Sequence, residues 1–495
     1  MAGIGFTLKK LFEDESYSAR SKAYAYSALV SAGPWIAAVV TVNIIILLSK
    51  FFLVEIAQRD LFMGTMVYSF VFSQIITAPW QLLITRYVSD RLYNREYAHI
   101  RPSLIGLSKI VFAISYIVSA LYYYPKDISL EYKIMAVYLF VFISIVWILM
   151  VYLSAVKNYA IISWAYGAGG IVSIGISAIL FKHPIEFARN AGASNLLLAY
   201  TLGITVTFAL LLYSFLKNFE SDSALEYDFI RYMDSFAALF FTGLFYTLGL
   251  WADDIIMWYS SLGVSIEEVY RYAPLYDNGV FLAYLTVIPT MILFMVSVET
   301  EFYDTYRKYF AFATKDASYD DIQSAKNEMK TCIYRNLIYI MENQTIISIT
   351  CIVVAGFVFS RLGLPIIVKD IFRICTLGAL CNIFILIIIL ILLYFEARNH
   401  ALAIALSFFA LNSLFTLYFL PLGVEFYGFG YFAGSFVSLC IAIVTMIIFL
   451  EELDYHTFAK QPLFESKSRG FFTRMAERLE PGRNRAPAKR RGIDA

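Results

Sequence analysis

The sequence predicts an all-α polytopic membrane protein with twelve transmembrane helices in two six-helix lobes. Of its 495 residues, 60% are hydrophobic, and the mean hydropathy is +0.67. Apolar runs recur along nearly the whole chain, and each is long enough for a helix to cross a hydrocarbon core about 30 Å thick. A membrane β-barrel would alternate apolar and polar residues instead. The continuous run NIFILIIILILLYF does not alternate, so we expect helices.

The most polar link near the middle of the chain, residues 217–233, divides the predicted spans equally. Residues 23–216 would form an N-lobe and residues 234–450 a C-lobe. Residues 1–22 would be an interfacial N-terminus, and residues 451–495 a basic tail. The expected spans are Ala23–Leu48, Phe62–Thr85, Leu104–Tyr124, Ile134–Ser154, Tyr159–Phe181 and Ala193–Leu216 in the N-lobe, and Phe236–Ser260, Gly279–Val298, Ile338–Ser360, Ile371–Phe395, Ala401–Leu420 and Gly430–Phe449 in the C-lobe.

Lysine and arginine gather in the segments that share one side of the membrane if the span count is even. The loop after the second span contains Arg86, Arg91 and Arg95, and the tail ends in AKRRGIDA. Cytoplasmic loops carry such an excess, so we expect both termini in the cytoplasm. The tail would be attracted to anionic membrane lipid. A basic tail alone does not predict binding to nucleic acid.

Residues 301–337 are predicted to form a cytoplasmic helical excursion. Tyr306 and Phe310 repeat at helical spacing. Ser318 and Asp321 have the spacing of a capping box that starts a second helix. Two interpretations remain open: an interfacial helix pair along the inner leaflet, or a docking surface for a cytoplasmic partner.

The stretch that joins the seventh and eighth spans carries ionisable residues that are costly in a membrane. Asp253 and Asp254 lie between Trp251 and Trp258. At the helical period, Trp251, Asp254 and Trp258 share one stripe, and Asp253 faces nearly the other way. One carboxylate could therefore face a central cavity while the other meets a neighbouring helix. The alternatives are a polar rim capped by interfacial tryptophans, or a carboxylate that binds a cation, a proton or an aminosugar.

Further acidic residues lie at both ends of the eighth span. Asp277 opens this span, and Glu299 and Glu301 close it. Such residues usually mark a pathway, a partner or an interface. The candidate residues for a translocation path or its gating are therefore Trp251, Asp253, Asp254, Trp258, Asp277, Glu299 and Glu301.

Three prolines interrupt predicted spans. Pro34, Pro79 and Pro289 lie in the first, second and eighth spans. Proline removes a helix hydrogen bond and kinks the helix. These residues are candidate hinges, with static packing kinks as the alternative.

Catalytic motifs are absent from the sequence. It contains no phosphate-binding P-loop, no G-x-S-x-G, no H-E-x-x-H, only 4 histidines, and 5 cysteines without a C-x-x-C pair. We therefore expect a transporter without a cofactor or metal site, and not an enzyme.

Several motifs together carry a family resemblance. The start MAGIGF, the segment AYAYSALVSAGPW, the tryptophan–aspartate pattern at Trp251–Trp258 and the run YDNGVFLAYLTVIPTMILFMVSVETEFYDTYRKYF resemble the PelG family. Its members are the membrane-spanning exporter subunits of the Pel exopolysaccharide system. The similarity extends over the whole chain, and the joint occurrence of the motifs is specific.

The resemblance implies a fold similar to two-lobed flippases and antiporters. It also implies translocation of a growing N-acetylhexosamine-rich polysaccharide across the bacterial cytoplasmic membrane. The implied partners are a cytoplasmic glycosyltransferase that uses UDP-sugars, a cyclic-di-GMP-sensing membrane subunit and a further small membrane scaffold subunit. Two other functions remain open: a cation- or proton-coupled small-molecule antiporter of the same architecture, and a membrane scaffold that transports nothing.

Overall fold

Helices that can cross a membrane dominate the structure. The computed structural model describes residues 26–28, 32–155, 159–187, 189–219, 225–297, 301–314, 317–361, 363–459 and 470–480. In these residues, 12 helical segments are long and apolar enough to span a membrane. They confirm the twelve predicted spans, because each overlaps one of the expected ranges.

The N-lobe is a bundle in which sequence neighbours and more distant helices interleave. Within it, α3 packs on α7, α4 packs on α6, and α8 packs on both α6 and α7. A short 3-10 turn, η1 (Tyr97–His99), leads into α5. The helices are α3 (Gly33–Phe51), α4 (Ile56–Tyr93), α5 (Ile100–Tyr123), α6 (Leu130–Ala155), α7 (Tyr159–Lys182) and α8 (Ala191–Asn218).

The C-lobe follows the turn η2 (Asp228–Arg231) and contains both strands found among the described residues. Its helix α15 packs between α9 and α16, and α14 packs on α10 and α16. The elements are α9 (Tyr232–Trp258), β1 (Val264–Ile266), β2 (Tyr270–Tyr272), α10 (Pro274–Leu285), α11 (Ile288–Ser297), α12 (Tyr303–Thr314), α13 (Tyr319–Arg361), α14 (Ile366–Tyr394), α15 (Arg398–Phe419), η4 (Leu420–Leu422), η5 (Val424–Phe426) and α16 (Phe429–Glu451). The tail that follows contains η6 (Tyr455–Ala459) and α17 (Phe471–Leu479).

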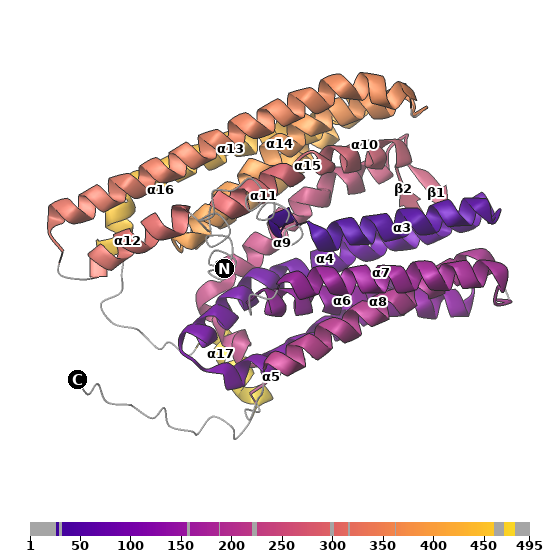
Figure 1. Ribbon diagram of the computed structural model, residues 1–495, viewed down its shortest axis with the longest axis horizontal. Helices are drawn as coiled ribbons and strands as arrows, with labels where there is room; N and C mark the ends of the chain where they lie inside the picture. The colour runs from indigo at the N-terminus through magenta and orange to yellow at the C-terminus, as the bar shows by residue number, and fades with distance from the viewer. Residues whose placement is uncertain are drawn as a thin grey trace.

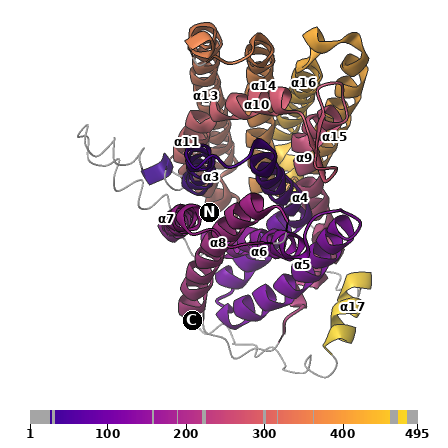
Figure 2. The ribbon, with the colours of Figure 1, turned by 90° about the vertical axis from the view of Figure 1, so that its right-hand side faces the viewer.

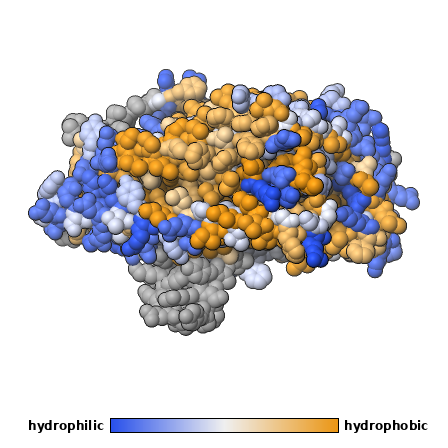
Figure 3. All heavy atoms as spheres, turned by 90° about the horizontal axis from the view of Figure 1, so that it is seen from above, coloured by the Kyte–Doolittle hydropathy of each residue, from blue (hydrophilic) through white to orange (hydrophobic). Residues whose placement is uncertain are grey.

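The two lobes lie side by side and meet along α4 and α9 (Figures 1 and 2). Here the end of the molecule that carries β1 and β2 is termed the hairpin end, and the opposite end the α12 end (Figure 1). On the face in Figure 3, an apolar band lies between hydrophilic residues gathered at both ends. This distribution fits a molecule that crosses a membrane along its long axis.

One cluster of buried side chains is continuous from lobe to lobe. It joins Phe62 and Leu197 of the N-lobe to Trp258 and Tyr270 of the C-lobe. A second cluster fills the α12 end of the N-lobe and includes Ala476 of α17. Helix α17 belongs to the predicted basic tail, and Asp234 holds it by accepting hydrogen bonds from two backbone N–H groups at its start.

The predicted proline positions have three different outcomes. Pro79 lies inside α4. Pro34 lies in the first turn of α3, where the missing N–H would be unpaired anyway. Pro289 lies in the first turn of α11, directly after a break in the eighth span at residues 286–287.

The break in the eighth span is bridged by a side chain of α13. Gln344 is fully buried. Its Nε2 donates to the Thr286 carbonyl at 3.3 Å, and its Oε1 accepts a hydrogen bond from Thr290. Unwound backbone at membrane depth needs such partners.

The helical excursion exists, but its second helix continues into the ninth span. The Asp321 N–H donates to the Ser318 hydroxyl at 3.2 Å, which confirms the predicted cap. From Tyr319, α13 runs for 43 residues without interruption, about 64 Å at 1.5 Å per residue. The second helix of the excursion and the ninth span are therefore one continuous helix, and both interpretations of the excursion remain predictions.

Candidate functional site

Asp253 is fully buried and faces the interior of the C-lobe. Its Oδ2 accepts from the Tyr276 hydroxyl at 2.7 Å, and its Oδ1 accepts from Asn412 Nδ2 at 2.9 Å. Asn412 also donates to the Gly249 carbonyl at 2.8 Å. Both carboxylate oxygens therefore have donors, and Asp253 ties α9 to α10 and α15.

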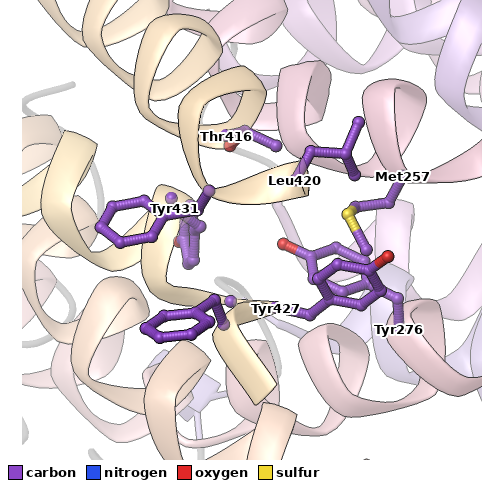
Figure 4. Close-up of a pocket in the computed structure, with 10 residues that line it drawn as sticks. Met257, Tyr276, Thr416, Leu420, Tyr427 and Tyr431 are labelled. Atoms are coloured by element: carbon purple, nitrogen blue, oxygen red, sulfur yellow. The ribbon is translucent and has the colours of Figure 1, made fainter. Parts of the chain in front are cut away.

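A small cavity beside Tyr276 shows how tightly this side is packed (Figure 4). Its volume is about 10 Å³, and Met257, Tyr276, Leu420 and Tyr427 contribute to its lining. That volume holds about one water molecule. Side chains therefore fill most of the space beside Tyr276, the residue that donates to Asp253.

Asp254 has different surroundings from Asp253. It is 4% exposed, and within the described residues its Oδ2 has no hydrogen-bond partner. The charged groups acting on it are two further carboxylates, Asp253 and Asp277. A buried polar oxygen without a partner is costly, so the hydrogen-bonding capacity of Asp254 Oδ2 is unmet within the described residues.

The two tryptophans of the stripe face α4 of the N-lobe. Trp251 Nε1 donates to Gln74 Oε1 at 2.9 Å. Trp258 stacks on Tyr68, with ring centroids 4.9 Å apart and an interplanar angle of 16°. The tryptophans of α9 therefore contact the N-lobe, and Asp253 contacts helices of the C-lobe. This confirms the prediction that the tryptophans and Asp253 lie on different faces of this helix.

Asp277 lies in the first turn of α10. It accepts from Trp258 Nε1 at 3.2 Å and from the Ala273 N–H at 3.2 Å. A carboxylate in the first helical turn also interacts favourably with the helix dipole. Asp277 therefore fixes the Trp258 ring on the α4 side.

The remaining two predicted residues do not join this group. Glu299 lies outside the described residues. Glu301 lies at the other end of α10 and α11, exposed, where Arg335 Nη2 is 2.9 Å from its Oε2. The structure therefore brings together Trp251, Asp253, Asp254, Trp258 and Asp277, and it leaves Glu301 at the α12 end.

A β-hairpin beside this site was missed at the level of sequence. Strands β1 and β2 pair antiparallel, with Ile266 opposite Tyr270. Glu267 and Glu268 at the turn have φ of 50° and 56°, as type I′ turns require. Such turns are usually marked by Asn-Gly or Asp-Gly, so Glu-Glu gave no signal.

Hydroxyl groups of the N-lobe hold the hairpin of the C-lobe. The Tyr68 hydroxyl donates to the Arg271 carbonyl at 2.7 Å, and the Tyr122 hydroxyl donates to the Val269 carbonyl at 2.6 Å. The Tyr270 hydroxyl lies 2.9 Å from Thr65 Oγ1 and 2.7 Å from the Tyr123 hydroxyl. These hydrogen bonds join the lobes at the hairpin end.

Close packing and burial reinforce this contact. A Cβ on Gly64 of α4 would lie 2.5 Å from the Tyr270 ring, so the hairpin needs glycine there. Burial raises the pKa of Tyr272 to about 12 and that of Tyr270 well above its usual value. Both hairpin tyrosines therefore stay protonated at physiological pH.

At the α12 end, a different contact joins the lobes. Arg86 Nη1 lies 2.6 Å from Glu396 Oε1, and the Arg86 guanidinium lies 5.3 Å from the centre of the Phe236 ring. Hydrogen bonds connect the lobes at one end and an ion pair at the other. Two helical lobes that meet in this way define a two-lobed membrane transporter.

The family comparison names the kind of transporter. A family model, PelG, described as "Putative exopolysaccharide Exporter (EPS-E)", matches residues 1–458. The chain belongs to this family, which confirms the resemblance carried by its motifs. It is accordingly a multi-pass membrane transporter and not an enzyme. A comparison with curated protein sequences gave no match.

Solved transporter structures share the fold. A variant of the Vibrio cholerae MATE transporter VcmN has a TM-score of 0.62 at 12% identity, covering 92% of this chain and 100% of that one. An outward-facing multidrug resistance MATE family transporter of the MOP superfamily has a TM-score of 0.60 at 12% identity, covering 88% and 96%. A MOP superfamily transporter from Pyrococcus furiosus has a TM-score of 0.56 at 12% identity, also covering 88% and 96%. Identities this low support the fold alone.

Proposed function

We propose that the protein translocates a growing N-acetylhexosamine-rich exopolysaccharide across the bacterial cytoplasmic membrane, as part of a synthase–exporter complex. The observation that carries this proposal is the exporter-family match over residues 1–458. The two-lobed transporter fold supports it, since such a fold supplies an interface through which a chain can pass.

The charge distribution supports an orientation for this transport. Arg86 and Arg91 lie in the last turns of α4, and Arg335 pairs with Glu301 just before α12. Cytoplasmic segments are enriched in such residues. In this proposal the α12 end and both termini are cytoplasmic, and the hairpin end faces outward. The polysaccharide would enter between the lobes at the α12 end.

The group around Asp254 is suited to contact sugar along this route. Trp251 is half-buried and offers an aromatic face on which the apolar face of a pyranose ring can stack, and the buried Trp258 lies one helical stripe position further along. Asp254 offers an unpartnered oxygen to a sugar hydroxyl, and Asp277 positions Trp258. Glu299 and Glu301 would act at the cytoplasmic entry, and Pro34, Pro79 and Pro289 remain candidate hinges.

Substitution within this group tests the site. Trp251→Ala and Asp254→Asn should each stop polymer secretion while the protein still inserts into the membrane. Secretion is measured as extracellular polysaccharide, and insertion by quantifying the protein in membrane fractions. Asp127→Asn is a matched control, because Asp127 is exposed at the hairpin end and pairs only with Arg189 in the described residues. Normal secretion by both site variants would remove the assignment.

The excursion formed by α12 and the start of α13 is our candidate docking surface for the synthase. Lys326 Nζ lies 2.6 Å from Asp454 Oδ2 and joins the excursion to the segment after α16. Burial opposes ionisation of Asp454, but hydrogen bonds from Lys326 and Gln323 hold its pKa below the usual value. This link is therefore ionised at cytoplasmic pH, so the excursion offers a fixed shape to a partner.

An affinity pull-down of the tagged protein in mild detergent tests complex membership. We expect mass spectrometry to identify a cytoplasmic UDP-sugar glycosyltransferase, a cyclic-di-GMP-sensing membrane subunit and a small membrane scaffold subunit. Reversing the exposed pair Lys308–Glu328 one residue at a time should weaken capture of the glycosyltransferase. A protein that purifies alone would contradict complex membership.

The unpartnered oxygen of Asp254 also favours a second candidate function. In this alternative the protein is a cation- or proton-coupled small-molecule antiporter, and Asp254 exchanges the coupling ion. Purified protein in liposomes would then transport in response to an ion gradient without partners, and Asp254→Asn would abolish the response. An absence of gradient-driven transport by the wild-type protein would exclude this function.

A further inference from the structure

A pocket of about 320 Å³ lies beside the hairpin, between the lobes. We propose that this pocket binds a pyranose unit of the exported chain, and that it takes neutral N-acetylated sugars in preference to sugars with free amino groups. The inference rests on the proposed polysaccharide export, and it adds a sugar subsite with a defined charge preference.

Both lobes build the pocket. The N-lobe contributes Tyr68, Tyr122 and Lys126, and the C-lobe contributes Trp258 and Arg271, among others. A chain that leaves between the lobes at the hairpin end meets residues of both. Ligand pockets of small molecules are about 300–1,000 Å³ in volume, so the space suits a sugar unit and not a coiled polymer.

Its aromatic walls are fixed before any ligand arrives. Tyr68 is stacked on Trp258, and the hydroxyls of Tyr68 and Tyr122 are engaged by the Arg271 and Val269 carbonyls. The rings therefore cannot turn freely. Because rigid surfaces lose little entropy on binding, they are suited to stack on the apolar face of a pyranose ring.

The charges of the pocket decide which sugars fit. Lys126 Nζ lies 5.3 Å from the centre of the Tyr122 ring, and the Arg271 guanidinium lies 5.2 Å from that of Tyr259. Glu268 is the single acid among the described residues that line the pocket. Both cations can donate to hydroxyl and acetamide oxygens, but they repel an ammonium group. The pocket therefore favours acetylated over deacetylated amino sugars.

Tyr259 is the most informative residue to remove. It lines the pocket and is 66% exposed, so its loss leaves the fold intact. Tyr124 provides a matched control, because it is an exposed tyrosine near the end of α5, 84% exposed, and it does not line the pocket.

The test measures binding of tetra-N-acetylchitotetraose, and of its fully deacetylated form, to the full-length protein in nanodiscs by isothermal titration calorimetry. We expect the acetylated tetramer to bind at least about tenfold more tightly than the deacetylated one. Tyr259→Ala should weaken its binding about tenfold, and Tyr124→Ala should not. Replacing Lys126 and Arg271 together by glutamine should narrow the difference between the two tetramers.

Two results would overturn the inference. One is equal binding of both tetramers, and the other is unchanged binding to the Tyr259→Ala variant. The latter would also be expected if lipid headgroups occupied the pocket. Polymer secretion separates this failure from that of the proposed function. If cells lacking the protein still secrete, export itself is wrong, whereas secretion that requires the protein without tetramer binding overturns the subsite alone.

Discussion

Asp253 and Asp254 are adjacent in sequence but differ in what their side chains contact. Asp253 accepts hydrogen bonds from Tyr276 and Asn412, whereas Asp254 Oδ2 has no partner in the described residues. A buried charge that is hydrogen-bonded supports the fold, and one that is not opposes it. Asp253 therefore stabilises the packing of α9 on its neighbours, whereas Asp254 destabilises the folded protein.

This difference predicts opposite effects on stability. Asp253→Asn places an amide where two donors point, and it should lower the free energy of unfolding by about 1–3 kcal/mol. Asp254→Asn removes a buried charge and should leave stability unchanged or raise it. Thermal unfolding of the purified variants in detergent measures both. An equal loss of stability in the two variants would contradict the assignment.

The helical period predicted that Asp253 and Asp254 face different ways on one helix, but it did not identify the partners of Asp253. Trp251, Asp254 and Trp258 belong to one helix, so the helical period alone predicts that they share a face. Asn412 lies 159 residues away in sequence, and only the packing of α15 against α9 brings it near. Local sequence carries no record of that packing.

At the scale of the elements, the eighth span also shows that local sequence does not predict contacts with distant segments. Pro289 predicted an interruption there, and the helix does break just before it. Gln344, which bridges the break, is one of many polar residues on the long helix α13. The sequence did not single it out, because its role depends on how α13 lies against α10 and α11.

Gln344→Leu should destabilise the break. It would leave the Thr286 carbonyl and the Thr290 hydroxyl without this partner, at a cost of about 1–3 kcal/mol. Titration with a denaturing detergent measures the loss. Asn343→Leu is the control, since Asn343 bonds only to the Tyr339 carbonyl of its own helix and should change stability by less than ~0.5 kcal/mol. Equal effects of both variants would show that the bridge contributes nothing.

For the whole molecule, the apolar runs predicted the twelve spans because crossing a membrane fixes their length. No such length requirement determines which residues of the two lobes contact each other. The contact at the hairpin end depends on tyrosines from three separate segments, among them Tyr68, Tyr122 and Tyr270. In a chain with 37 tyrosines, composition cannot reveal which ones join the lobes.

Removing two of these hydroxyls should loosen the lobes from each other. Tyr68→Phe combined with Tyr122→Phe keeps both rings but loses three hydrogen bonds to the hairpin, each worth about 1 kcal/mol. Hydrogen–deuterium exchange of residues 264–272 should become at least about tenfold faster. Tyr138→Phe, which loses a hydroxyl contact to Thr205 within the N-lobe, should leave it unchanged. Unaltered protection in the double variant would mean that other contacts hold the hairpin.

Because α13 is continuous, it connects the excursion rigidly to the broken eighth span. The same helix carries the excursion at its beginning and Gln344 25 residues later (344 − 319), about 38 Å along the rod. A continuous helix resists bending, so a partner that tilted the start of α13 at the α12 end would also displace the side chain that bridges the broken span. Binding of a partner to the excursion and the conformation of the broken eighth span are thereby mechanically linked, although no ligand passes between the two places.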